Sequence, residues 1–503
     1  MINEYENLRP NLAKKIYLTV CLLNRLRTSV RAGLISRLHE ITFADFRDSF
    51  FRPLEHVVEV EENFSTKECY YTARHPEIAQ IVFIRVLSDR VDRLHEYVNI
   101  VGRLNLSYNT DREAYKGLIR AKSLHELFPA FEDVQQIFRV ALSIGKDDAY
   151  LYQQRANYER IRPNGNLEDA ERYLRVAREL EPRNNAIIHT LAEVYRLKAE
   201  KSENKIIKTK YREQARSLIK SIMGRGRDDQ YPKVTMVKMA IDDVKDLLNA
   251  HDSNDKEIDD AIREVERLLE QEVQYSAHKQ YLLTLEADFS ELLTNHPRSL
   301  AALERAFELN PRDPYIANRL SRAHIKQNNI EGAKKILSEA LASNRGDLRL
   351  NYQYAETLRI SGETDVDGIA YYYERSFTPG DRNYEAQFWF ARYACESREE
   401  KKRNKSREVF SLLRSSSILH DEKVRIKDVA KKDGIYIVYN GEIERVEATY
   451  GYIKRQGDAE RIFIHSNNVE KGLWKSLKRW DRVNYNIGYN YSGPAAINVE
   501  LIR

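Results

Sequence analysis

The chain contains the stretch TYGYIKRQGDAERIFIH at residues 449–465, in which two short alternating runs flank a polar segment. Alternation with a period of two is typical of β-strands, because every second side chain lies on the same face. Tyr450 and Tyr452 are therefore predicted to share one face, and Phe463 and His465 the same face of the next strand. Four flat rings on adjacent strands form a platform for nucleobases, at about 1–3 kcal/mol per stacked base.

Three cationic residues lie next to these runs, namely Lys454, Arg455 and Arg461. Their side chains are predicted to contact the phosphates of a nucleic acid whose bases stack on the rings. The alternative is that the four rings are partly buried side chains of the sheet and contact no ligand.

The order of motifs around this stretch resembles that of the cold-shock domain, an OB-type barrel. The motifs are Gly441–Ile453, Ile462–His465 and Gly493–Val499, within residues 433–503. The resemblance implies a five-stranded barrel over residues 421–503 that binds single-stranded RNA or DNA through the four rings. The sequence departs from the family at Arg445, Val446 and Ser466, where the family has aromatic residues, so only part of the family's platform is expected.

The middle of the chain carries a helical repeat with a period of about 34 residues, which is the period of the tetratricopeptide repeat. Small residues recur where two helices of such a repeat lie in close contact, and prolines follow the second helix because they cannot continue it. The clearest copy is Leu320, Ser321, His324, Asn328, Ala333, Leu337 and Ala340, and a second copy is Ala170, Leu174, Ala177 and Pro182. These spacings predict an α-solenoid over residues 132–420 that binds a protein ligand.

The first 131 residues show a different pattern. Two amphipathic segments, Leu12–Leu26 and Phe43–Leu54, precede two short runs, Val57–Val60 and Cys69–Thr72, which are predicted to form a β-hairpin. Helices followed by a hairpin predict a winged-helix-like domain over residues 1–88 and a helical linker over residues 89–131. Directly after the hairpin, Ala73-Arg74-His75-Pro76 opens a further helix, with proline in its first turn.

This order of parts, with Ala73-Arg74-His75-Pro76 as its motif, resembles the C-terminal part of a STAND-type P-loop NTPase of the antiviral or antiphage type. The resemblance implies that His75, with Arg74 beside it, senses a nucleotide phosphate at a helix N-terminus, where anions are favoured. The alternative is that the two residues only begin a helix. No GxxxxGK[ST] loop occurs in the chain. We therefore expect no cofactor on this chain, ATP or ADP on an upstream NTPase domain, oligomers through that domain, and Met1 as a late start.

Composition limits the classes of function that this chain can have. Lys and Arg number 82 against 77 Asp and Glu, so nucleic-acid binding must depend on a local patch and not on the net charge of +5. Three separated cysteines without a ligand cluster fit a reducing cytoplasm and predict no metal site. The sequence shows no catalytic grouping, no leading apolar segment and no membrane-length apolar run, so we expect a cytoplasmic protein that is not an enzyme.

Two functions fit these features. The first is the sensor region of a STAND-like defence or signalling NTPase, in which the solenoid binds a protein trigger and the barrel binds single-stranded nucleic acid or docks on the solenoid. The second is a stand-alone tetratricopeptide scaffold with an RNA-binding cold-shock tail and no nucleotide switch.

Overall fold

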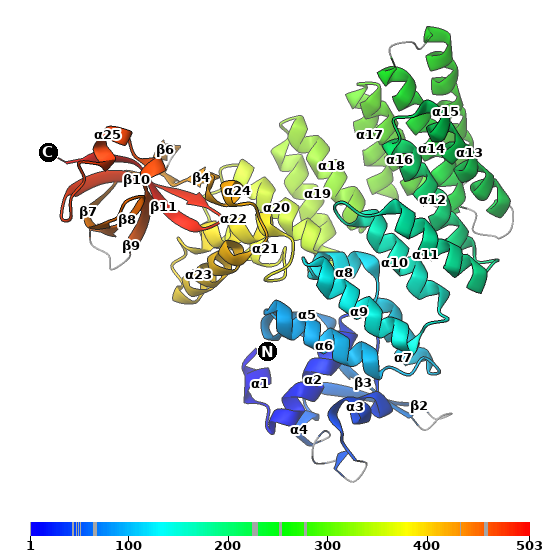
Figure 1. The fold of residues 1–503 in the computed structure, drawn as a ribbon, viewed down its shortest axis with the longest axis horizontal. Helices are drawn as coiled ribbons and strands as arrows, with labels where there is room; N and C mark the ends of the chain where they lie inside the picture. The colour runs from blue at the N-terminus through cyan, green and yellow to red at the C-terminus, as the bar shows by residue number, and fades with distance from the viewer. Residues whose placement is uncertain are drawn as a thin grey trace. The chain divides into compact units, whose positions relative to one another are not determined.

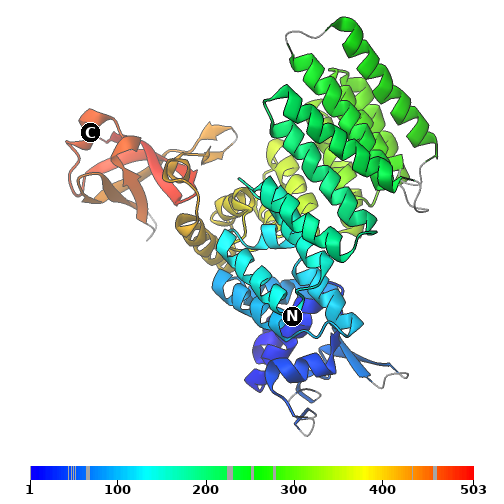
Figure 2. The ribbon, with the colours of Figure 1, turned by 45° about the vertical axis from the view of Figure 1, so that its right-hand side comes forward.

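The computed structural model describes residues 2–42, 45, 46, 48, 50, 52–63, 68–223, 230–250, 254–275, 279–432, 434–456 and 461–502. The chain divides into two compact units, Met1–Thr357 and Leu358–Arg503. Figures 1 and 2 show their elements, which are described below unit by unit.

The first unit begins with a small mixed part. Its elements are α1 (Ile2–Asn7), α2 (Asn11–Asn24), β1 (Val30–Arg31), α3 (Ala32–His39), α4 (Arg52–Leu54), β2 (Val58–Asn63), β3 (Glu68–Ala73) and α5 (Pro76–Val86). The predicted hairpin is confirmed, since β2 and β3 pair antiparallel with Val58 opposite Ala73, and β1 pairs with the other edge of β3. The second predicted amphipathic segment begins at Phe43, which lies outside the described residues. One hydrophobic core joins this part to the next helices, from Ala13 to Tyr158.

The rest of the first unit is helical. The helices are α6 (Arg90–Arg103), α7 (Asn109–Leu118), α8 (Ala121–Leu127), α9 (Phe131–Ile144), α10 (Ala149–Ile161), α11 (Leu167–Leu180), α12 (Asn185–Lys201), α13 (Lys205–Ile222), α14 (Gln230–Asn249), α15 (Asp255–Tyr275), α16 (Lys279–Leu292), α17 (His296–Leu309), α18 (Pro314–Lys326), α19 (Ile330–Ser343) and α20 (Leu348–Ile360), which ends in the second unit. Consecutive helices pack in pairs, as the repeat pattern predicts.

The two helices of the clearest repeat are α18 and α19. Asp313 caps α18 by accepting hydrogen bonds from the amides of Tyr315 and Ile316, and Asn329 caps α19. Ser321, Ala333, Leu337 and Ala340 are fully buried. The small residues therefore lie where the sequence places the close contact between helices, and the solenoid is confirmed.

The second unit contains further helices and the C-terminal sheets. Its elements are α21 (Val366–Glu374), α22 (Tyr384–Ala394), α23 (Glu400–Ser415), α24 (His420–Val424), β4 (Asp428–Val429), β5 (Lys431–Lys432), β6 (Ile435–Tyr436), β7 (Tyr439–Val446), β8 (Tyr450–Arg455), β9 (Arg461–His465), the 3-10 helix η2 (Ser466–Asn468), α25 (Lys471–Trp474), β10 (Arg482–Asn490) and β11 (Gly493–Leu501).

Five strands of this unit close into a barrel in the order β7–β8–β9–β11–β10, with β10 pairing back to β7. β9 and β11 run parallel, and the other pairs are antiparallel. Ile443, Ile453, Ile464 and Val483 fill the interior and are fully buried. The predicted five-stranded barrel is confirmed, and β4 extends it beside β10.

The barrel packs on α22 and α23 of its own unit through charged and aromatic side chains. Arg392 of α22 donates to the Asp428 carboxylate of β4 at 2.7 Å, lies 2.9 Å from Glu396, and stacks on the Tyr489 ring. Burial alone would lower the pKa of Arg392, but Tyr489, Glu396 and Asp428 raise it above its ordinary value, so the guanidinium stays charged.

A second group of contacts lies at the turn between β10 and β11. Glu385 of α22 accepts hydrogen bonds from Lys427 and Tyr491, both at 2.8 Å. Burial alone would raise the pKa of Glu385, but these hydrogen bonds lower it, so the carboxylate stays ionised. Arg414 of α23 donates to the carbonyl of Ser492 in the same turn. The barrel is therefore held on the helices of its own unit by paired charges.

Candidate nucleic-acid interface

The register of β8 and β9 brings the four predicted rings together. Tyr450 lies opposite His465, and Tyr452 lies opposite Phe463. The ring centroids of Tyr450 and Phe463 are 6.3 Å apart with nearly parallel planes, and those of Tyr452 and Phe463 are 5.9 Å apart edge to face. Phe463 and His465 are 6.4 Å apart. We call these four residues the ring cluster.

The ring cluster lies on the outer face of the barrel. The alternate residues Gly451, Ile453, Ile462 and Ile464 are buried, so the rings between them point outward. The Phe463 side chain is 37% exposed, and the other three rings are partly exposed. The ring faces are therefore accessible to a flat ligand from solvent.

Gly451 allows β7 to approach β8 closely between the two tyrosines. A Cβ atom at Gly451 would lie 2.5 Å from the carbonyl oxygen of Arg445, which no larger residue can tolerate without a backbone shift. The register of β7 against β8 shifts between Ile443 and Arg445, and places Arg445 opposite Tyr452. The glycine and the bulge together fix how the tyrosines are presented.

A local hydrogen bond orients His465. Its Nδ1 accepts from the amide of Asn467 at 3.1 Å and caps the 3-10 helix η2. In the neutral ring the proton is then on Nε2, which is a donor. His465 can therefore offer both a ring face and an N–H group to a base.

The structure places two of the three predicted cations with the ring cluster. Lys454 and Arg461 lie opposite each other on the same face as the rings. Arg455 is two residues from the buried Ile453 on β8, so its side chain lies on the same face as that of Ile453. Its guanidinium lies 4.3 Å from the Tyr439 ring. Arg455 is thus separated from the ring cluster because a side chain one residue along a strand faces the other way.

Acidic side chains partly neutralise this face. Glu444 of β7 forms an ion pair with Arg461 at 2.8 Å. Arg445 donates to Glu447 at 2.6 Å, and this hydrogen bond raises the pKa of Arg445. Two of the cations around the rings, Arg445 and Arg461, are therefore engaged by carboxylates.

Replacing Glu444 with glutamine is expected to increase the affinity for a single-stranded oligonucleotide by up to about fivefold, since an exposed ion pair is worth about 0.2–1 kcal/mol. The change frees Arg461 for a phosphate and removes a negative charge. A titration over a range of salt concentrations should also show about one additional phosphate contact. Glu422→Gln on α24 makes the same change of net charge away from the rings and is the control. Equal effects of the two variants would mean that Glu444 is not at the interface.

Sequence reasoning missed Trp480, in the loop before β10. Its indole is 61% exposed, and the Arg479 guanidinium lies 4.6 Å from the ring. The sequence signal is the mixture of basic and aromatic residues in Lys475–Arg482, which is typical of nucleic-acid contacts.

Arg74 and His75 lie in the first unit and are exposed. His75 is the N-cap residue of α5, and its Nδ1 accepts from the amide of Glu77 at 3.3 Å. The imidazole thus lies at a helix N-terminus, where it already satisfies one backbone donor.

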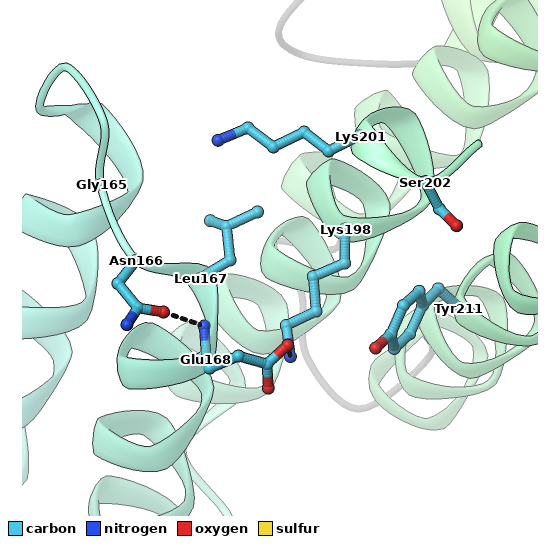
Figure 3. A pocket seen from close by; sticks show the side chains of 8 residues that line it. All are labelled: Gly165, Asn166, Leu167, Glu168, Lys198, Lys201, Ser202 and Tyr211. Atoms are coloured by element: carbon cyan, nitrogen blue, oxygen red, sulfur yellow. Dashed lines mark hydrogen bonds and ion pairs between the residues drawn. The ribbon is translucent and has the colours of Figure 1, made fainter. Parts of the chain in front are cut away.

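A pocket of about 280 Å³ lies in the first unit among α11, α12 and α13. Figure 3 shows its lining, which includes Glu168, Lys198 and Tyr211. Lys198 is buried and pairs with Glu168 at 2.7 Å and with Glu171 at 2.5 Å. Both carboxylates pair with the Lys198 ammonium, so this lysine offers no unpaired charge to a ligand in the pocket.

The described residues lack two features, a cluster of metal ligands and a helix of membrane-spanning length. Among them, no three His, Cys, Asp or Glu side chains gather where they could hold a metal ion. Within the same part of the chain, no helix is long and apolar enough to cross a bilayer.

Comparisons with known proteins agree with this geometry. Residues 439–502 match the 'Cold-shock' DNA-binding domain family, and residues 295–356 match the tetratricopeptide repeat family. No curated protein matches the chain. The ring cluster falls entirely within the first of the two matched segments.

Solved structures of tetratricopeptide proteins are similar over parts of the chain. A protein from Thermus thermophilus shares 15% identity, with 42% of this chain and 99% of that chain covered and a TM-score of 0.31. One from Parabacteroides merdae shares 11% identity, with 52% and 91% covered and a TM-score of 0.30. The C-terminal part of a repeat protein from Cytophaga hutchinsonii shares 14%, with 52% and 96% covered and a TM-score of 0.31. The family matches and the barrel topology carry the assignment: the chain is a mostly helical tetratricopeptide-type solenoid that ends in a closed five-stranded barrel matching the cold-shock domain.

Proposed function

We propose that this protein binds single-stranded nucleic acid on the outer face of its barrel, while its helical repeats bind a protein partner. The observation that carries the proposal is the ring cluster, in which four rings from two strands lie side by side and partly exposed. Tetratricopeptide solenoids are protein-binding scaffolds and cold-shock domains bind nucleic acid, so the two activities fit the two matched families.

The chemistry of the ring cluster favours unpaired bases. Stacking on a side-chain ring requires access to the flat face of a base, which neighbouring base pairs cover inside a duplex. Stacking is also tolerant of sequence, because every base has such a face. The protein therefore distinguishes single strands from duplexes more strongly than it distinguishes one base sequence from another, and it binds RNA or DNA.

Comparing the affinities for a single-stranded oligonucleotide and for its duplex tests this function. Fluorescence anisotropy of the full-length chain should show tighter binding to a labelled single-stranded oligonucleotide than to the same oligonucleotide annealed to its complement. Equal affinities would mean that binding depends on phosphates alone, and absence of binding to both would refute the proposal.

A second candidate function rests on the position of His75. The hairpin β2–β3 leads directly into α5, and the imidazole lies at the N-terminus of that helix, where a nearby anion is favoured. In this candidate the chain is the cytoplasmic sensor region of a STAND-like defence or signalling NTPase. ATP or ADP bound to an NTPase domain would then be sensed by His75 and Arg74, and oligomers would form through that domain.

The substitution His75→Asn separates the two roles of this residue. Asparagine is a good N-cap, so the helix and the thermal stability should be retained, whereas the imidazole is lost. In a complex with the partner NTPase, the variant should assemble without its normal dependence on ATP or ADP. His56→Asn, at another exposed histidine of the first unit, is the control. An unchanged nucleotide response of His75→Asn would leave this residue as a helix cap only.

A further inference from the structure

The loop Lys475–Arg482 combines an exposed tryptophan with a cluster of basic residues. The other two tryptophans, Trp389 and Trp474, are 7% and 9% exposed, whereas Trp480 is 61% exposed. Tryptophan is enriched among the residues that contribute most of the energy of an interface. We propose that Trp480 stacks a second segment of the same nucleic-acid strand, beyond the ring cluster. This inference rests on the proposed function.

The backbone of Trp480 supports this role. Its φ angle is +76°, in the left-handed region that favours glycine and is uncommon for a bulky residue. The Trp480 amide donates to the carbonyl of Ile443 at 2.7 Å, and the Ile443 amide donates to the carbonyl of Asp481 at 2.9 Å. These two bonds hold the strained turn against β7. A position suited to glycine thus carries an exposed indole. Strained backbone conformations of this kind are concentrated at functional sites.

The charge of the loop selects an anionic ligand. Lys475, Lys478 and Arg479 are exposed, and Arg482 lies 3.4 Å from Glu442. Asp481 is the one acidic residue between positions 475 and 482, and its carboxylate accepts from the amide of Lys478 at 2.7 Å. Cations next to an exposed ring match a nucleic-acid strand, in which phosphates alternate with bases.

Trp480 and the ring cluster lie on opposite sides of β7. Ile443 bonds the Trp480–Asp481 backbone on one edge of this strand and pairs with Ile453 of β8 on its other edge. Neighbouring strands are about 4.8 Å apart, so the Trp480 backbone is about 10 Å from the strand that carries Tyr450 and Tyr452. A single-stranded nucleic acid of a few nucleotides can therefore contact Trp480 and the ring cluster at the same time.

Intrinsic fluorescence tests the inference, because Trp480 is far more exposed than the other two tryptophans. Oligothymidylates of about four and about eight nucleotides cover the range of OB-fold site sizes. Adding the longer one to the full-length chain should quench the tryptophan emission and protect it from acrylamide. The substitution Trp480→Gly should abolish the quenching and lower the affinity for the longer oligonucleotide about 5- to 100-fold, as for one stacked base. The loss for the shorter oligonucleotide should be smaller.

Three variants are compared in this test, namely Trp480→Gly, Trp480→Phe and a control. Trp480→Gly should fold at least as well as the wild type, since glycine suits the left-handed backbone, and Trp480→Phe retains a ring and should retain part of the affinity. Leu419→Ala, at the exposed apolar N-cap residue of α24, is the control and should leave binding unchanged.

The outcomes separate this inference from the proposed function. Full affinity of Trp480→Gly, with wild-type emission unchanged when the oligonucleotide binds, overturns the inference and leaves the function standing. No oligonucleotide binding by the wild type overturns both. Quenching by polyglutamate but not by oligothymidylate would show that the loop binds an acidic protein, which also contradicts the inference.

Discussion

Replacing both Tyr452 and Phe463 with alanine is expected to lower the affinity of the full-length chain for single-stranded oligonucleotides by about 30-fold or more. Each stacked base contributes about 1–3 kcal/mol, and 1.4 kcal/mol corresponds to a factor of ten. The two residues lie opposite each other in the ring cluster, so their loss leaves only the Tyr450 and His465 rings for stacking. Anisotropy titrations with the same oligonucleotide measure the effect.

The double variant must keep its fold for this result to be informative. Both side chains point outward from a barrel whose interior residues are unchanged, so the thermal unfolding midpoint should shift little. Tyr371→Ala, at an exposed tyrosine of α21, is the matched control and should bind as the wild type does. A folded double variant with wild-type affinity would show that the rings are barrel side chains without a ligand.

Replacing Arg392 with alanine is expected to destabilise the second unit by about 2–4 kcal/mol. Breaking a buried ion pair costs about 3–5 kcal/mol, and the effect here is smaller because Asp428 and Glu396 are partly exposed. The variant also loses the contact between the guanidinium and the Tyr489 ring. Chemical unfolding monitored by circular dichroism measures the free-energy change.

Limited proteolysis shows whether the barrel separates from α22. In the variant, the segment before β4 should be cleaved faster, since β4 no longer has its ion pair with α22. Arg407→Ala, at an exposed arginine of α23, removes an equal charge and should change neither the stability nor the cleavage rate appreciably. Unchanged unfolding of Arg392→Ala would mean that other contacts hold the barrel.

Local periodicity was sufficient to predict the main elements. The period of two in residues 449–465 predicted both strands and the shared face of the rings, because side-chain direction along a strand depends only on parity. The spacing of Ala333, Leu337 and Ala340 predicted a helix face that is indeed buried. These features depend on neighbours within a few residues, which a sequence shows directly.

Features that depend on tertiary register could not be predicted in this way. Arg455 is adjacent in sequence to Lys454 but lies over Tyr439, because parity separates consecutive residues. The pairing of Glu444 with Arg461 requires the arrangement of three strands, including the bulge in β7. Arg392 and Asp428 meet although they are 36 positions apart in the sequence. The exposure of Trp480 likewise depends on how the loop is bonded to β7.

Photochemical crosslinking is the sharpest test of nucleic-acid binding by the barrel, because it identifies the residues that contact the bases. A single-stranded RNA containing 4-thiouridine is bound to the full-length chain and irradiated, and the crosslinked peptides are identified by mass spectrometry. Crosslinks are expected in Tyr450–His465, with further crosslinks in Lys475–Arg482 for longer RNA. Crosslinks confined to peptides of the helical repeats would contradict the account, since nucleic acid would then bind to the solenoid and not to the barrel.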